Sequence, residues 1–277
     1  MRFGVIVTSC NSPQALAACL GGLARQSRPL DEVIVSDDGS DPEPAAAIRT
    51  ACAAAGASGL PVRLVAMPHR TRSVAAVRNL GIRNASSDYL LFLDGDILPG
   101  PEVLTAHAAV AATGRFLIGD RALLDRTQTE ALFAANPAAT DFDALWRVAN
   151  CTHLERVERK FRWHQWKRRL GLASRHKPQI LACHFSAACA DLAAVNGFDE
   201  RYVDWGSEDD DLAARLYLAG CTSRSVISAA RAIHLWHPSR APAKGAPNPN
   251  RAYFRRRRLR ARCAAGLVNE PDGAPNR

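Results

Sequence analysis

The sequence predicts an α/β fold in which a mostly parallel central sheet is covered by helices on both faces. Two features of the first hundred residues support this prediction: apolar runs suited to buried strands recur, and a helical stretch separates each run from the next. Continuous apolar strands between helices are typical of parallel sheets, because helices bury both faces of such sheets. The expected strands are 3–8, 32–36, 62–67 and 89–93, and the expected helices are 13–26, 42–55 and 73–84.

Polar residues follow three of these strands directly, at Thr8–Asn11, Asp37–Ser40 and Asp94–Asp96. Ligands of open α/β sheets bind at the carboxyl ends of the strands. We therefore expect these three segments to lie together and to form part of a binding site.

Asp94 and Asp96 are two residues apart at the end of a strand. Side chains at this spacing in an extended segment point the same way, so both carboxylates can converge on one cation. Hard oxygen ligands suit Mg²⁺ or Mn²⁺ that bridges a diphosphate. The alternative is a simple strand-ending turn, since Asp and Gly are common in turns.

Four consecutive acidic residues, 208–211, follow Trp205-Gly206-Ser207 and precede a helical pattern that ends at Gly220. Ser207 and Asp210 have the spacing of a capping box, and acidic residues in a first turn are favoured by the helix dipole. Capping does not require Glu208 and Asp209. These two carboxylates are therefore candidate site residues.

The net charge of +9 is concentrated in two segments. Residues 153–177 hold nine Lys and Arg against two acidic residues, and residues 251–277 hold eight Arg against two. Such patches indicate an anionic partner.

No run approaches the ~18 apolar residues of a membrane span. The N-terminal segment of the chain is too polar for an export signal, and the eight scattered cysteines suit reduced thiols. We therefore expect a cytoplasmic protein.

The first basic segment predicts a helix over 155–171 with an aromatic, imperfectly amphipathic face. It suits either a membrane interface or packing over the sheet with its basic side in solvent. In the second segment, the arginines of 251–262 suit an anionic lipid surface, and we expect 269–277 to be disordered.

Several motifs resemble the family-two glycosyltransferases. They are Thr-Ser-x-Asn after the first strand, Val-Ser-Asp-Asp-Gly-Ser, Arg78-Asn79-Leu80-Gly81 and Phe-Leu-Asp-Gly-Asp. Downstream, Asn196–Glu200 and 205–212 resemble the C-terminal region of β-1,4-galactosyltransferases and chondroitin-polymerase-type enzymes. The resemblance covers about 3–100 and 180–238 and implies a GT-A fold, which is a nucleotide-diphospho-sugar transferase fold.

The resemblance also implies roles for individual residues. Thr8 and Asp38 would hold uracil, Arg78 would lie near the diphosphate, and Asp96 would ligate the metal, with Asp94 reaching the ribose, the metal or its water. A third metal ligand is expected in 232–238, where His234 is favoured and His237 is the alternative; a nitrogen ligand favours Mn²⁺ over Mg²⁺. Asp209 would be the general base and Glu208 would orient donor sugar or acceptor. The implied nucleotide-sugar-binding set is Thr8, Asp38, Arg78, Asp94, Trp205 and Gly206.

These roles describe a metal-dependent, inverting transfer from a UDP-sugar to a hydroxyl of a glycan or lipid-linked glycan. The expected organisation is a GT-A domain over 1–240 and a basic, partly disordered tail over 241–277. Within the domain, 1–120 would bind the nucleotide, 121–178 would be a basic helical insert and 179–240 would be the acceptor and catalytic half. The expected location is cytoplasmic and peripheral on the cytoplasmic face of the inner membrane.

Two other classes of protein compete with this interpretation. A sugar-phosphate nucleotidyltransferase would need a glycine-rich loop after the first strand, and residues 8–13 are not such a loop. A non-enzymatic nucleic-acid-binding protein would use the two basic segments but would leave the strand-end carboxylates unexplained. We therefore expect no nucleic-acid partner.

Overall fold

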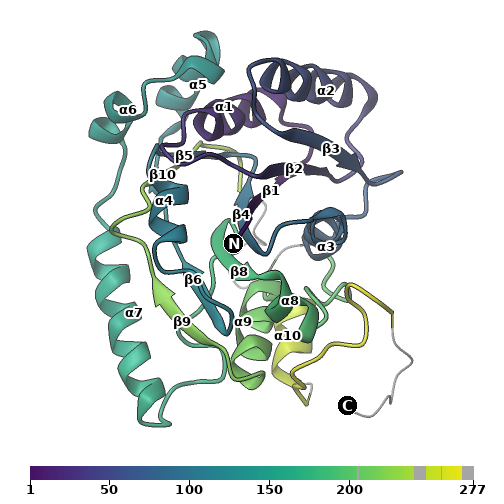
Figure 1. Ribbon diagram of the computed structural model, residues 1–277, viewed down its shortest axis with the longest axis vertical. Coiled ribbons are helices and arrows are strands. Elements are labelled where there is room, and N and C mark those ends of the chain that lie inside the picture. The colour runs from purple at the N-terminus through teal and green to yellow at the C-terminus, as the bar shows by residue number, and fades with distance from the viewer. Residues whose placement is uncertain (205, 240–247, 257, 270–277) are drawn as a thin grey trace.

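The computed structural model describes the chain except for residues 205, 240–247, 257 and 270–277. Its central element is a seven-stranded sheet with the order β3-β2-β1-β4-β8-β6-β9 (Figure 1). Strands β1 to β4 are parallel, β8 is antiparallel to β4 and β6, and β9 is parallel to β6, which confirms the mostly parallel α/β sheet. The strands are β1 Phe3–Ser9, β2 Glu32–Asp37, β3 Val62–Ala66, β4 Tyr89–Asp94, β6 Arg115–Ile118, β8 His184–Ala188 and β9 Thr222–Ser225.

Both faces of this sheet are buried, as the continuous apolar strands predict. On one face, Val5 and Val7 of β1 pack with helices α1 (Pro13–Ala24) and α2 (Pro42–Ala57). On the other face, Ile6 of the same strand packs with helices α3 (Val74–Asn84) and α9 (Glu208–Leu218). Side chains alternate between faces along a strand, so two separate hydrophobic cores share β1 and β4.

A second, three-stranded sheet has the order β5-β10-β7. It is formed by β5 (Ile97–Pro99), β10 (Ala232–His234) and β7 (Ala122–Leu123), with β10 antiparallel to β5. The register pairs His234 with Ile97, and the backbone N–H of Leu235 donates to the carbonyl of Asp96 at 2.9 Å. The short strand β10 therefore places His234, its last residue, beside the loop after β4.

The remaining helices surround these sheets (Figure 1). The predicted basic helix over 155–171 is observed as α7, which lies along the side of the molecule opposite α3. The bounds of the remaining helices are α4 Val103–Ala108, α5 Arg126–Ala134, α6 Phe142–Val148, α7 Leu154–Arg169, α8 Cys189–Ala194 and α10 Pro249–Arg256, with a short 3-10 turn at Pro137–Ala139.

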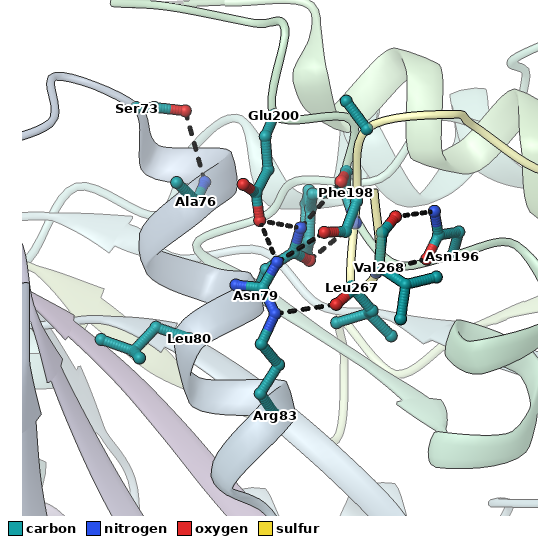
Figure 2. Close-up of polar contacts among 12 residues, drawn as sticks. Ser73, Ala76, Asn79, Leu80, Arg83, Asn196, Phe198, Glu200, Leu267 and Val268 are labelled. Carbon is teal, nitrogen blue, oxygen red and sulfur yellow. Dashed lines mark hydrogen bonds and ion pairs between the residues drawn. The ribbon is translucent and has the colours of Figure 1, made fainter. Parts of the chain in front are cut away.

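Helix α3 is anchored to the turn at Asn196–Glu200 through the side chain of Asn79 (Figure 2). Asn79 donates to the carbonyl of Phe198 at 2.8 Å and accepts from its N–H at 2.9 Å. Asn79 also donates to Glu200, and Arg83 pairs with Glu200 at 2.7 Å. The motif that begins at Arg78 therefore contains the contact that fixes α3 to the second half of the domain.

The described part of the expected tail packs against the domain. The amide of Asn196 donates to the carbonyls of Cys263 and Val268 at 2.9 and 2.8 Å. Arg83 donates to the carbonyls of Gly266 and Leu267 on the same segment. These backbone contacts hold the segment in place. Residues 270–277, most of the segment expected to be disordered, lie outside the described residues.

Candidate active site

A cavity of about 450 Å³ opens at the carboxyl ends of β1 and β4, between α3 and the start of α9. It brings together nearly all of the predicted site residues, although these come from six separate segments. Gly206 stands two residues before the cavity-lining Glu208, and Trp205 lies outside the described residues. The predicted residues that line the cavity are Thr8, Asp38, Arg78, Asp94, Asp96, Glu208, Asp209, His234 and His237.

Arg78 lies at the centre of this cavity wall and joins two carboxylates. Its guanidinium is 3.0 Å from Oδ1 of Asp94 and 3.2 Å from Oε1 of Glu208, and its side chain is 4% exposed. Arg78 is therefore not a solvated arginine of the helix surface. Thr8 donates to the same oxygen of Asp94 at 2.8 Å. The residues assigned to donor binding thus form one connected network.

This network sets the ionisation of Asp94. Burial alone would raise the pKa of Asp94, but the charge of Arg78 and the hydrogen bond from Thr8 outweigh it and lower the pKa. Burial alone would likewise lower the pKa of Arg78, and the two facing carboxylates raise it. Asp94 is therefore a carboxylate and Arg78 a cation across the physiological pH range.

Asp96 forms a second cluster with both candidate histidines. Its Oδ2 is 3.1 Å from Nε2 of His237 and its Oδ1 is 3.8 Å from Nε2 of His234. One ligand atom from each of the three residues lies within 4.8 Å of the other two. The structure therefore brings both histidines to Asp96, whereas the sequence analysis favoured one and kept the other as an alternative.

The chemistry of this cluster fits a divalent cation. Burial lowers the pKa of His234 although Asp96 opposes the shift, so the imidazole is held in the neutral form that ligates metals. Oδ1 of Asp96 is buried and makes no hydrogen bond within the described part of the chain. Two imidazole nitrogens beside a carboxylate suit Mn²⁺ better than Mg²⁺.

The start of α9 differs from the predicted capping box. Gly206 and Ser207 both have left-handed backbones, with φ of +102° and +73°, and Ser207 makes no side-chain capping hydrogen bond. Side-chain capping requires an N-cap residue with an extended backbone, which Ser207 lacks. Asp210 is not its capping partner either: its Oδ1 lies 3.8 Å from Nε2 of His176.

The four acidic residues of this turn occupy four different environments. Glu208 pairs with Arg78, and Asp210 faces His176. Asp211 is fully buried against Arg215, whose Nε donates to Oδ2 of Asp211 at 2.6 Å, so this pair belongs to the interior of α9. Asp209 is the one that lines the cavity without an ion pair among the described contacts.

The pKa of the Asp209 carboxyl group is strongly raised. Burial, together with the negative charges of Glu208 and Asp210, raises its pKa to about 8. A general base works best when its pKa lies near the operating pH. Asp209 therefore has the environment that proton abstraction near neutral pH requires.

At the end of β2, the adjacent residues Asp37 and Asp38 have different environments. Asp37 is buried and accepts from the N–H and hydroxyl of Ser40, so it shapes the turn. Asp38 lines the cavity and is oriented by Thr71, whose N–H and hydroxyl donate to its Oδ1 at 2.8 and 2.6 Å.

Sequence reasoning missed three residues at the site, namely Thr71, Arg121 and His176. Thr71 orients Asp38, Arg121 lines the cavity, and His176 faces Asp210. His176 was counted only as part of a basic segment, and Arg121 belongs to a region without a motif. Their contacts come from segments that pack together only in the folded chain.

The sheet, with its acidic loop after β4 and the acidic helix start that faces the same cavity, defines a glycosyltransferase of the GT-A fold. Residues 4–176 match the glycosyl transferase family 2, so the chain belongs to this family. Residues 172–238 match the N-terminal domain of galactosyltransferase. These matches decide for a glycosyltransferase and against the nucleotidyltransferase and nucleic-acid-binding alternatives.

Similar proteins include the validoxylamine A glucosyltransferase of Streptomyces hygroscopicus subsp. jinggangensis, which is 31% identical over 78% of this chain and 51% of its own. The chondroitin synthase of Escherichia coli is 28% identical over 85% of this chain and 35% of its own. The chain thus spans about half or less of the length of these relatives.

Among solved structures, the mannosyltransferase PcManGT from Pyrobaculum calidifontis, in complex with GDP-Man and Mn²⁺, has a TM-score of 0.57 and 18% identity. That match covers 88% of this chain and 58% of PcManGT. S. aureus TarS in complex with UDP-GlcNAc has a TM-score of 0.56 and 17% identity, over 90% of this chain and 62% of that one. At these identities the similarity shows the shared fold.

The raised pKa of Asp209 predicts a pH-dependent gain in stability for Asp209→Asn. The unfolded chain ionises Asp209 near the ordinary pKa of about 4, whereas the folded chain holds the proton up to about pH 8. Between these values the folded state binds the extra proton, so the wild-type free energy of unfolding falls as the pH rises. The side-chain amide of the Asp209→Asn variant cannot ionise. We expect the free energy of unfolding of the variant to exceed that of the wild type by an amount that is absent in acid, grows through neutral pH and levels off above about pH 8.

Urea unfolding at a series of pH values, without added metal, measures this difference. Asp211→Asn is the matched control: it weakens the buried pair with Arg215 and should lose stability at every pH. A difference between Asp209→Asn and wild type that did not change with pH would contradict the raised pKa.

Proposed function

We propose that this domain transfers a hexose or N-acetylhexosamine from a UDP-sugar to a hydroxyl of a glycan or lipid-linked glycan, with inversion and with a requirement for Mn²⁺ or Mg²⁺. One observation carries the proposal: the group Asp96, His234 and His237 lines the same cavity as Asp209. A metal site and a carboxyl base in one cavity are the components that a displacement at a nucleotide-sugar requires.

The part of the cavity at Asp38 supports UDP as the nucleotide of the donor. Asp38 is held by Thr71 at the cavity wall, where its carboxylate can accept a hydrogen bond from the imide N–H of uracil. Thr8 lines the same wall but donates to Asp94, so it also positions the acidic loop. The TarS complex contains UDP-GlcNAc, which supports the same class of donor.

The diphosphate would be bound at the Asp96 group. A divalent cation held by Asp96, His234 and His237 would supply positive charge to the diphosphate as it leaves. The residues themselves fit this role through the neutral imidazole of His234, the ring nitrogen of His237 and a carboxylate oxygen. Arg78 pairs with Asp94 and Glu208 through its two terminal nitrogens, and we assign it to holding both carboxylates at the diphosphate end of the cavity.

The acceptor would be activated by Asp209. Its carboxylate takes the proton of the acceptor hydroxyl while that oxygen attacks C1 from the face opposite the nucleotide, and a single displacement of this kind inverts the configuration. Glu208 is held by Arg78 through Oε1, while its Oε2 is buried without a hydrogen bond in the described part of the chain. That oxygen can accept a hydrogen bond from a sugar or acceptor hydroxyl and orient the attack.

A membrane setting is supported by the outer surface of α7. Trp163 and Trp166 stack with ring centroids 5.0 Å apart and are 52% and 49% exposed, among exposed basic residues of the same helix. Aromatic and basic side chains together are typical of helices that lie in a membrane interface. Within the described residues, no helix is long and apolar enough to cross a membrane. We propose peripheral binding at the cytoplasmic face through 153–177, supplemented by the arginines of 251–262.

The metal assignment predicts that Asp96→Ala, His234→Ala and His237→Ala each weaken Mn²⁺-dependent UDP binding. Each removes one ligand, and the loss should be at least the roughly 10–100-fold that follows the loss of a residue supporting a metal ligand. Calorimetric titration of UDP with and without Mn²⁺ measures it. His164→Ala, outside this cavity, is the control. Unchanged Mn²⁺ dependence in all three variants would remove the site, and loss in only one histidine variant would assign a single imidazole ligand.

The base assignment predicts that Asp209→Asn lowers turnover by about 10²–10⁴-fold. The amide keeps the size of the side chain but cannot take the acceptor proton. UDP binding should persist, because Asp38 and the Asp96 group are unchanged. Asp210→Asn on the same helical turn is the matched control and should remain active. An inactive Asp210→Asn beside an active Asp209→Asn would move the base by one residue, and activity in both would leave the turn without a base.

The membrane proposal predicts that Trp163→Ala combined with Trp166→Ala reduces sedimentation with anionic vesicles by several-fold. The double variant removes the aromatic side chains that would enter the interface and leaves all charges intact. Val148→Ala, an exposed apolar residue of α6, is the control. Equal sedimentation of the double variant and wild type at moderate salt would exclude α7 as the contact.

A further inference from the structure

A second cavity, of about 390 Å³, lies beneath α7 and has no role in the chemistry described above. Its wall is largely apolar, with Val157 and Phe161 on α7 facing Ile118 and Leu181. A volume of this size falls within the range of small-molecule sites, which are mostly apolar with a few polar groups. The cavity is therefore suited to an apolar group of a ligand.

The polar groups of this cavity are predominantly cationic. Lys160, Lys177 and Arg121 line it, and the only carboxylate in the lining, Asp120, is already paired with Arg121 at 3.1 Å. The lining thus has an excess of positive charge. Burial lowers the pKa of Lys177, which is the effect expected for an ammonium group drawn into a partly apolar wall. An anion beside these groups would be favoured.

The cavity adjoins the active site. Arg121 and Leu181 line both cavities. Lys177 lines the second cavity and follows His176, whose Nε2 is 3.8 Å from Asp210, the neighbour of the proposed base Asp209. A ligand in the second cavity can therefore extend towards the catalytic carboxylates.

We propose that the cavity beneath α7 binds the acceptor, and that the acceptor is an amphiphile with an apolar chain, an anionic group of the phosphate type and a terminal hydroxyl. The chain occupies the apolar cavity, the anion lies against Lys160, Lys177 and Arg121, and the hydroxyl reaches Asp209. The inference rests on the proposed function and selects the lipid-linked acceptor over the free glycan.

Calorimetric titration with farnesyl phosphate below its aggregation concentration tests the proposal directly. Farnesol and inorganic phosphate, each carrying one half of the ligand, are the comparison ligands, and both should bind at least about tenfold more weakly because the cavity is built for the two parts together. Val157→Trp, which fills the cavity from α7, should abolish binding of farnesyl phosphate.

Lys160→Glu should weaken farnesyl phosphate about tenfold or more by placing a carboxylate beside the anion. Arg156→Glu makes the same change of charge four residues earlier on α7, outside the lining, and should retain wild-type affinity to within about twofold. This pair separates a specific contact from general attraction to a basic helix.

UDP titration with Mn²⁺ on the same samples separates the two proposals. Failure of farnesyl phosphate to bind while UDP binds normally, or equal losses in Lys160→Glu and Arg156→Glu, would overturn the acceptor site and leave the proposed function standing. Failure of UDP to bind would overturn the proposed function, and the amphiphile titration would still report on the cavity because it needs no donor. Transfer to a free oligosaccharide without any binding of farnesyl phosphate would identify a soluble acceptor instead.

Discussion

The ion pairs of the buried Arg78 side chain are the constraint on which the site depends. A guanidinium that is 4% exposed has lost its hydration, and the carboxylates of Asp94 and Glu208 offset that loss from two sides. Removing one partner of a buried pair typically costs about 3–5 kcal/mol, because the other charge stays buried. Asp94 ends β4 and Glu208 begins α9, so one side chain fixes this strand and this helix relative to each other.

The packing of α3 explains how this guanidinium reaches its partners. The side chain of Asn79 donates one hydrogen bond to the backbone of Phe198 and accepts another from it. This pair fixes the helix to the turn that leads towards α9. On the sheet side, a Cβ at Gly81 would lie 2.6 Å from Cγ2 of Ile6, so only glycine permits this close approach of α3 to β1. The Arg-Asn-Leu-Gly motif thus combines one charge contact, one backbone anchor and one steric requirement.

Local sequence patterns predicted the order of strands and helices and the approach of Asp94 and Asp96 to the edge of the sheet, because periodicity and strand ends are properties of short segments. The environment of Arg78 could not be predicted this way, since its partner on α9 lies far along the chain. The Ser207 pattern failed because a left-handed backbone, which spacing does not reveal, replaced the capping box. The contacts of Asn196 with the carbonyls of Cys263 and Val268 could not be predicted either, because hydrogen bonds to the backbone leave no mark on composition.

The short strand β10 gives the proposed metal-binding group of Asp96, His234 and His237 an all-or-none character. Only three residues pair β10 with β5, and this pairing places His234 opposite Ile97, next to Asp96. Successive side chains of a strand point to opposite faces, so a slip of one residue would turn the imidazole of His234 away from the carboxylate rather than displace it slightly. A slip of β10 by one residue against β5 would therefore remove the proposed ligand completely, whereas conservative substitutions within β10 that keep His234 would leave its position unchanged.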